Sequence, residues 1–236
     1  MKKNLQDKYS DWYKYISNDF LSHRKEQFLS IAYQASEAIL NPEVRSVLEF
    51  GIGRGSTLAL VKHFGIHHKG VDFNDQLFTP DTVSTIINYK DSEKYDLVCA
   101  FQVLEHNPKE TIVEHLEKMK EFSNKYIYIS VPFSGRWISI NININLFPRR
   151  SFKKNININW QRVFKKVRPI EEYMKRENKD KYNPHWWEVG DKNLTKNDFK
   201  KLVNSLDLKI IKSFHNELFP YHLFYLMETK NEGVKS

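Results

Sequence analysis

The fold is decided by one short stretch of sequence, Glu49-Phe50-Gly51-Ile52-Gly53-Arg54-Gly55. It follows a β-prone run that begins at Ser46, and it precedes a helical pattern from Ser56 to Phe64. Glycines at alternate positions allow a tight turn and let a ligand approach the backbone without meeting a Cβ atom. A dinucleotide fingerprint needs Gly or Ala where Ser56 stands, and a phosphate-binding P-loop needs Gly-Lys-Ser/Thr at the end of the turn. The stretch therefore indicates a strand–loop–helix unit for a nucleoside-type ligand without a pyrophosphate.

An acidic residue follows at a spacing that suits such a ligand. Asp72 lies near the end of the next expected strand, residues 69–73, and comes 21 residues after Gly51. A carboxylate at this position can accept hydrogen bonds from both hydroxyls of a ribose. Capping of a turn is the simpler structural role for Asp72, but the glycine loop, strand and acid together favour ribose binding.

The rest of the chain alternates short strands with helices, which predicts an α/β fold with a parallel sheet wrapped on both faces. Strands are expected at residues 46–51, 69–73, 82–87, 95–101, 126–131, 208–214 and 218–227. Helices are expected at residues 5–40 (in two runs), 56–64, 108–122 and 195–206. The expected helix caps are Ser56 or Thr57, then Asn107, and finally Thr195 in a capping box with Asp198.

These stretches resemble the class I S-adenosylmethionine-dependent methyltransferases, of the small-molecule type with a Val-Leu-Glu-His motif. The matching residues are Val47 to Gly55, Gly70 to Phe73, Pro80 to Val83, Tyr95 to His106 and Tyr126 to Pro132. The resemblance is strong over residues 44–132 and looser over 195–228. It implies a Rossmann-like, mostly parallel seven-stranded sheet with helices on both faces, and here a basic lid insertion follows the fifth strand.

The resemblance also implies roles for individual residues around S-adenosyl-L-methionine. Asp72 would hold the ribose, and Phe73 would lie near the adenine. Phe101 and Gln102 would border the methionine moiety and the transferred methyl group. The residues that would surround the methionine half are Glu49, Gly51, Gly53 and Gly55.

Charge divides the chain into a neutral core and a basic attachment. The whole chain carries a net charge of +8, and residues 133–190 alone hold 13 Lys/Arg against 5 Asp/Glu. The expected organisation is N-terminal helices at 1–43, a cofactor-binding half at 44–132, a basic aromatic lid at 133–190, a closing helix and strand pair at 191–230, and a tail at 231–236. The N-terminal helices either cover the cofactor or form a dimer contact.

The insertion contains Asn-Ile-Asn-Ile-Asn twice, at residues 141–145 and 155–159. Compositional bias is the plainer interpretation, and the alternative is a short hairpin with Pro148-Arg149-Arg150 between the two copies of the repeat. The Lys/Arg residues, interleaved with Phe152, Trp160 and Phe164, suit either an exposed lid surface or a patch that tracks a nucleic-acid backbone. The same charge suits a phosphorylated or nucleotide-activated sugar, or an anionic membrane surface.

Three residues are candidates for a general base, which methyl transfer needs only when the acceptor must lose a proton. His106 lies in the Leu-Glu-His of the family motif, where holding the loop is an equally good role. His185 and Glu188 flank Trp186 and Trp187, and an aromatic edge with a titratable pair suits acceptor binding. The structural alternative is that a tryptophan anchors the lid while His185 is a bystander. The pair His67 and His68 is expected at the surface.

Composition limits the remaining classes of function. With Cys99 as the single cysteine, neither a disulfide framework nor a thiolate metal site can form within one chain, and no ligand spacing predicts a metal. Met1 to Ser10 has no apolar core, so we expect no secretory signal, and no stretch stays apolar for about 18 residues, so we expect no transmembrane helix. The protein is expected to be cytoplasmic. The expected function is methyl transfer to oxygen or nitrogen of a small molecule such as a sugar, a nucleotide sugar or a lipid-linked intermediate. The alternatives are an RNA or other nucleic-acid methyltransferase and a non-catalytic cofactor-binding or partner-binding module.

Overall fold

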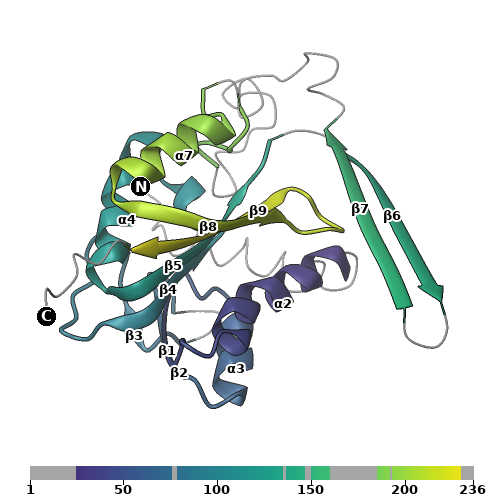
Figure 1. Cartoon of the computed structure of the whole chain (residues 1–236). Helices are drawn as coiled ribbons and strands as arrows, with labels where there is room; N and C mark the ends of the chain where they lie inside the picture. Colours follow the sequence, from purple (N-terminus) through teal and green to yellow (C-terminus); the bar gives the residue numbers. More distant parts are fainter. Residues whose placement is uncertain are drawn as a thin grey trace, which may run out of the picture.

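Seven strands form one mixed sheet in the order β3-β2-β1-β4-β5-β9-β8 (Figure 1). The structure, a computed structural model, describes residues 25–75, 79–134, 137–146, 150–159, 185–191 and 193–229. Strands β1 to β5 pair in parallel, whereas β9 runs antiparallel to β5 and to β8. This topology confirms the expected Rossmann-like fold. The strands are β1 (Ser46–Phe50), β2 (His67–Asp72), β3 (Thr82–Val83), β4 (Tyr95–Phe101), β5 (Ser123–Pro132), β8 (Leu208–His215) and β9 (His222–Thr229).

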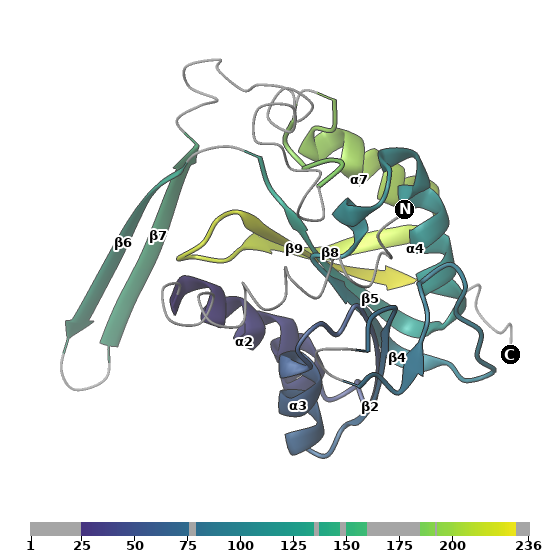
Figure 2. The same cartoon turned by 180° about the vertical axis from the view of Figure 1, so that it is seen from behind.

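Helices cover both faces of this sheet, as Figures 1 and 2 show. Helices α2 (Lys25–Leu40) and α3 (Ser56–His63) pack on one face, and α4 (Ile112–Glu121) and α7 (Lys196–Ser205) pack on the other. Successive side chains of a strand point to opposite faces, so β4 serves both layers. Its Leu97, Cys99 and Phe101 join the cluster that includes Ala35 of α2, while Val98 and Ala100 join the cluster beneath α4.

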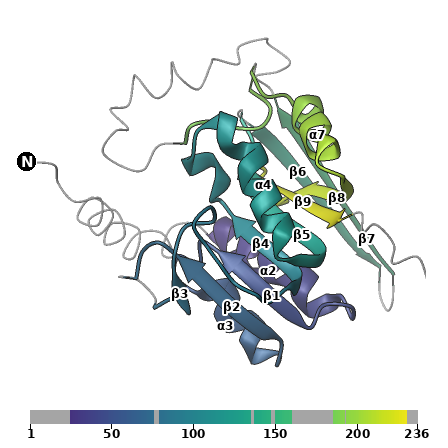
Figure 3. The same cartoon turned by 90° about the vertical axis from the view of Figure 1, so that its left-hand side faces the viewer.

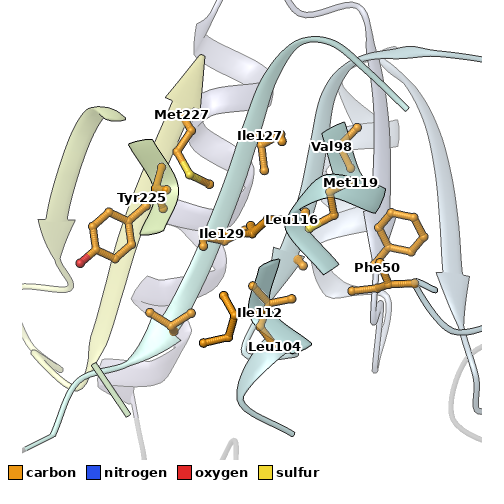
Figure 4. Close-up of a cluster of buried hydrophobic side chains, with 14 of the residues drawn as sticks. Phe50, Val98, Leu104, Ile112, Leu116, Met119, Ile127, Ile129, Tyr225 and Met227 are labelled. Carbon is orange, nitrogen blue, oxygen red and sulfur yellow. The ribbon is translucent and has the colours of Figure 1, made fainter. Parts of the chain in front are cut away.

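The larger hydrophobic core lies between α4 and the sheet (Figure 4). Ile112, Leu116 and Met119 recur at helical spacing on α4 and are at most 1% exposed. They pack with Ile127 and Ile129 of β5 in one buried cluster. Burial of each such side chain contributes about 1.5–3 kcal/mol, so α4 fixes the position of the loop that precedes it.

Three expected elements differ clearly from the structure at their ends. The last strand, expected from Leu218, begins only at His222, because the amide of His222 bonds back to the carbonyl of Phe219 and closes a turn. The third strand was expected over residues 82–87, but β3 ends at Val83 because the amide of Tyr89 bonds back to the carbonyls of Thr85 and Ile86 and closes a turn. The helix expected from Pro108 begins as a 3-10 turn, η2 (Lys109–Thr111), and becomes α-helical at Ile112. Asn107 is therefore not its cap: its side chain donates to the carbonyl of Val103 instead.

Of the other two expected helix caps, one is confirmed and one is wrong. Thr195 caps α7 in the expected capping box with Asp198. Neither Ser56 nor Thr57 caps α3, because the N-cap is Gly55 in a left-handed conformation. The hydroxyl of Thr57 donates to Gln34 Oε1 on α2 and ties the two helices together.

The insertion after β5 contains a second, two-stranded sheet of β6 (Trp137–Leu146) and β7 (Arg150–Asn159). The pairing is antiparallel from Trp137↔Asn159 to Leu146↔Arg150, so the hairpin interpretation of the repeats is confirmed. The hairpin stands to one side of the main sheet, beyond the turn that joins β8 and β9 (Figures 1 and 3). Residues 160–184 and the expected first helix, up to residue 24, lie outside the described residues, so the lid role stays a prediction.

Candidate functional site at the carboxyl edge of the sheet

The glycine loop between β1 and α3 has the left-handed backbone that its sequence indicates. Gly51, Gly53 and Gly55 have φ values of 74°, 51° and 67°. A Cβ atom on Gly51 would lie 2.4 Å from Val103 Cγ2, so the loop after β4 approaches too closely for any other residue. At Gly53 no atom lies within 4 Å of the equivalent Cβ position among the described residues, which leaves the backbone open to a ligand.

Asp72 connects this loop to the end of β2. Its Oδ2 accepts from the amide of Gly53 at 2.9 Å, and its Oδ1 accepts from the amide of Asn74 at 3.0 Å. Burial raises the pKa of Asp72, and hydrogen bonds from the amides of Asn74, Gly53 and Phe73 offset part of that rise. Each carboxylate oxygen has a second lone pair, so Asp72 can still accept hydrogen bonds from the hydroxyls of a ribose. Phe73 follows and is 45% exposed.

Glu49 is placed beneath the loop and contacts a residue that the sequence analysis put at the surface. Its Oε2 lies 2.9 Å from Nε2 of His68, and both side chains are buried. Burial raises the pKa of Glu49, and the bond to His68 opposes that rise. His67 is exposed as expected, but the surface prediction is wrong for His68, because β2 is an interior strand and its second residue faces Glu49 of β1.

Phe101 and Gln102 end β4 beside the loop. Phe101 is buried against Tyr128 on the α2 side of the sheet, with ring centroids 5.2 Å apart. Gln102 has a φ of 56°, and its backbone nitrogen donates to the carbonyl oxygen of Ser130 at 2.9 Å. In the side-chain orientation that satisfies both ends of its amide, it donates to Glu105 Oε1 and accepts from Ser130 Oγ, each at 3.2 Å. Gln102 thus connects the cofactor side of the site to the next cluster.

All three predicted base candidates lie together in that cluster. His106 ends η1 (Leu104–His106), and its ring centroid is 4.9 Å from that of His185. The Tyr221 hydroxyl donates to Glu188 Oε1 at 2.7 Å and lies 3.0 Å from His185 Nδ1. A tyrosine has one proton to donate, so His185 Nδ1 carries the proton of the second bond and His185 Nε2 carries the ring's lone pair.

The segment that carries His185 and Glu188 is held by backbone bonds to the core. The amide of Trp186 donates to the carbonyl of Glu105 at 2.7 Å, and the amide of Val189 donates to the carbonyl of Pro132 at 3.0 Å. Trp187 is 2% exposed, and its indole Nε1 donates to the carbonyl of Asn107. Trp187 is therefore the structural anchor that the sequence allowed for, whereas Trp186 is 55% exposed and available to a ligand.

Burial shifts two titratable groups in and beside this cluster. The Glu105 side chain is buried, which raises its pKa to about 7, although the nearby His185 opposes the rise. Its Oε2 has no hydrogen-bond partner within the part of the chain that the structure describes. Burial also lowers the pKa of His222 to about 4, so this imidazole is neutral at physiological pH.

Sequence reasoning missed Glu105 and Tyr221 as site residues. Glu105 stands in the Leu-Glu-His motif next to His106, and this position was the available signal. Tyr221 stands just before β9, and no pattern around it indicated a role. The ligand atoms of Glu105, His106 and His185 lie within 4.8 Å of one another, so a small cation could be held there, although the sequence predicted no metal.

Comparisons with known proteins identify the family. The chain matches the family described as "Methyltransferase domain" over residues 5–187. No curated protein sequence matches it significantly. Within the part of the chain that the structure describes, no helix is both long and apolar enough to cross a bilayer.

Solved structures share its fold at low sequence identity. Magnesium protoporphyrin IX methyltransferase from Synechocystis PCC 6803, with bound S-adenosylhomocysteine, has a TM-score of 0.56 and 12% identity over 95% of this chain and 94% of its own. The 1,6-didemethyltoxoflavin-N1-methyltransferase of Burkholderia thailandensis has a TM-score of 0.57 and 12% identity, over 95% of this chain and 87% of its own. The N-methyltransferase NodS of Bradyrhizobium japonicum WM9 has a TM-score of 0.55 and 9% identity, over 88% of this chain and 98% of its own.

The family match extends from before the glycine loop to Trp187, so it includes the loop, Asp72, His106 and His185, and ends just before Glu188. The chain therefore belongs to the methyltransferase family, with the Rossmann-like class I methyltransferase fold.

Proposed function

We propose that this protein transfers the methyl group of S-adenosyl-L-methionine to an oxygen or nitrogen atom of a small molecule. The acceptor classes that we favour are sugars, nucleotide sugars and lipid-linked intermediates. The observation that carries the proposal is the set of hydrogen bonds that joins Glu188, Tyr221 and His185 beside η1. Val103, just before η1, is the residue that approaches Gly51 of the glycine loop. Similarity to methyltransferases that act on a porphyrin and on a toxoflavin precursor supports a small acceptor.

The loop has the features that the cofactor requires. Gly53 is open on the side where its Cβ would stand, and Asp72 retains lone pairs for ribose hydroxyls. Residues proposed to hold the methionine half are Glu49, Gly51, Gly53 and Gly55, with Phe101 and Gln102 beside the methyl group and Phe73 near the adenine. When bound, S-adenosyl-L-methionine would supply an electrophilic methyl carbon. A lone pair of the acceptor would attack this carbon, and S-adenosylhomocysteine would leave.

The protein's own contribution is alignment and removal of a proton. His185 Nε2 accepts the acceptor's proton, and the resulting imidazolium keeps its Nδ1–H bond to the Tyr221 hydroxyl. Tyr221 in turn donates to Glu188, whose carboxylate stabilises the positive charge through this chain. His106 stacks edge-on against His185 and orients it. Trp186 provides an exposed aromatic surface for the acceptor.

Cofactor binding is tested by calorimetric titration with S-adenosylhomocysteine, with NAD as the control ligand. We expect Asp72→Ala to lose S-adenosylhomocysteine binding while remaining folded. Asp96→Ala is the matched control, because Asp96 also accepts two backbone amides, those of Arg45 and Ser46, but at the opposite end of the sheet. Normal binding by Asp72→Ala would show that the ribose is not held by this carboxylate.

The base is tested by turnover with a panel of sugar, nucleotide-sugar and lipid-linked acceptors. His185→Gln and Glu188→Gln should lower kcat by about 10²–10⁴-fold, with little change in S-adenosylhomocysteine affinity. Tyr221→Phe should lower kcat by less than His185→Gln does and should shift the pH profile of kcat, because it removes the hydroxyl that links His185 to Glu188. Chelation with EDTA should leave the rate unchanged. If EDTA removed the activity and a divalent metal restored it, Glu105, His106 and His185 would instead be a metal site, and His185 would not be the base.

Two results would favour the alternative functions. Methylation of RNA, with binding that weakens steeply as salt rises, would indicate a nucleic-acid methyltransferase that uses the basic segment. Cofactor binding without turnover on any acceptor would indicate a non-catalytic binding module.

A further inference from the structure

The β6–β7 hairpin has two chemically different faces. Isoleucine occupies every second position of β6, at Ile138, Ile140, Ile142 and Ile144, so all four side chains stand on one face. The register places Ile158, Ile156, Lys154 and Phe152 of β7 opposite them on the same face. The other row of β6 is polar, with Ser139, Asn141, Asn143 and Asn145.

The isoleucine face is exposed although it is apolar. Ile138 is 53% exposed, Ile144 46% and Phe152 53%, and Ile140, Ile142 and Ile158 all exceed one third. The hairpin strands pair only with each other among the described strands. The hairpin is joined to the core at its base, where the Trp137 ring lies 5.3 Å from that of Phe133. A two-stranded ribbon with an uncovered apolar face is only marginally stable in water, so this face calls for a partner.

The charge of the segment limits the chemistry of that partner. Residues 133–170 contain nine Lys/Arg and no Asp/Glu. Lys154 is exposed and lies within the isoleucine row itself, opposite Ile142. Two copies of the hairpin with their isoleucine faces together would bury both Lys154 side chains in an apolar contact, which disfavours self-association. The partner must therefore be apolar and anionic on the same surface.

We propose that the isoleucine face of the hairpin docks on the surface of an anionic lipid bilayer. The isoleucines and Phe152 enter the boundary between headgroups and acyl chains, while Lys154 extends its ammonium group to the lipid phosphates. The Asn row faces water. The hairpin lies along the interface and does not cross it, because its unpaired strand edges need water or headgroups as hydrogen-bond partners. This proposal concerns a surface outside the catalytic site and does not depend on the proposed acceptor.

The test is co-sedimentation of the full-length protein with vesicles of phosphatidylglycerol mixed with phosphatidylcholine. We expect binding to these vesicles, and at least about tenfold weaker binding to phosphatidylcholine alone or in high salt, because the basic segment contributes to the attraction. The triple variant Ile140→Thr/Ile142→Thr/Ile144→Thr keeps β-branched side chains but removes apolar surface, and should bind about tenfold more weakly. The matched control Ser139→Thr/Asn141→Thr/Asn143→Thr changes three positions of the polar row and should bind as the unaltered protein does.

Folding of each variant is checked independently by its S-adenosylhomocysteine affinity, which should not change because the hairpin does not contribute to the glycine loop. Absence of binding to anionic vesicles would overturn the proposal. Equal binding by both triple variants would also overturn it, because the isoleucine face would then play no part. Sedimentation velocity without lipid tests for a dimer. If the unaltered protein were a dimer and the isoleucine variant a monomer, the partner of this face would be a second copy of the chain and not a bilayer.

Discussion

At the scale of single residues, Gly53 gives the sharpest expectation for cofactor binding. Gly53→Ala should weaken S-adenosylhomocysteine binding at least about tenfold, because the new Cβ would occupy the open side of the loop backbone. Gly65→Ala is the matched control, since Gly65 also has a positive φ and no atom of the described residues within 4 Å of its Cβ position, but lies after α3. Both variants should lose similar stability, about 1–2 kcal/mol, measured by urea unfolding. Equal affinity in the two variants would contradict the placement of the cofactor at Gly53.

Glu105 makes stability depend on pH. The pKa of its carboxyl is raised to about 7 in the folded protein by burial, from an ordinary value of 4.5. The native state therefore holds this proton more tightly than the unfolded state does, and stability falls as the pH rises from 4.5 to about 7. Glu105→Gln keeps a neutral side chain at every pH, so it should be more stable than the unaltered protein by about 1–3 kcal/mol near pH 8 and nearly equal near pH 5.

Urea unfolding at the two pH values measures this difference, and Glu114→Gln on the exposed side of α4 supplies the control. A constant difference between Glu105→Gln and the unaltered protein across this range would show that Glu105 stays charged when folded.

Residues near the cofactor loop could be predicted because each one ends a strand that the sequence marks clearly. Asp72 is the last residue of β2 and Gln102 follows β4, and parallel strands bring their carboxyl ends to one edge of the sheet. Tyr221 could not be predicted as a site residue, and Glu105 only from its place in the Leu-Glu-His motif, because their environment forms only when residues 185–191 fold back onto η1 and β5. Such contacts between distant segments leave no local pattern.

At the scale of elements, the two helix caps provide a paired prediction. Thr195→Ala should lower the free energy of unfolding by about 1 kcal/mol, because the Thr195 hydroxyl accepts the amide of the third residue of α7. Ser56→Ala should change it by less than about 0.3 kcal/mol, because no side chain caps α3. Chemical denaturation of the two variants measures both values. A similar loss in both would contradict Gly55 as the N-cap.

The cap error has an identifiable physical cause. A serine before an apolar helical run is a good capping signal, but the glycine loop already supplies a left-handed residue at the turn into α3. The left-handed backbone of Gly55 therefore decided the start of the helix. The early end of the third strand has a different cause, because Tyr89 turns inward against Phe50, with ring centroids 5.3 Å apart.

At the scale of the whole molecule, the hairpin should be separable from the cofactor-binding core. Replacing residues 138–158 by two glycines should leave S-adenosylhomocysteine affinity unchanged within about twofold, because the seven-stranded sheet is complete without β6 and β7. Calorimetric titration measures the affinity, and the far-ultraviolet circular dichroism spectrum confirms the fold. A large loss of affinity would mean that the insertion helps to form the cofactor site.

The overall architecture could be predicted from the order of the elements, because alternating strands and helices allow few topologies. The place of the insertion along the chain was also evident, since its charge and its Asn-Ile repeats differ from the core. The position of the hairpin beside the β8–β9 turn could not be predicted, because nothing in the Asn-Ile repeats indicates which part of the molecule lies next to them.

The hairpin also affects how the protein behaves at high concentration. Each of its outer edges presents ten residues of backbone that no other described strand pairs with. Unpaired edges next to alternating isoleucine and asparagine are a template for adding further strands, the first step toward cross-β aggregates. The basic residues of this segment oppose that step through mutual repulsion, so polyanions or concentrated salt that neutralise them should promote precipitation of the free protein.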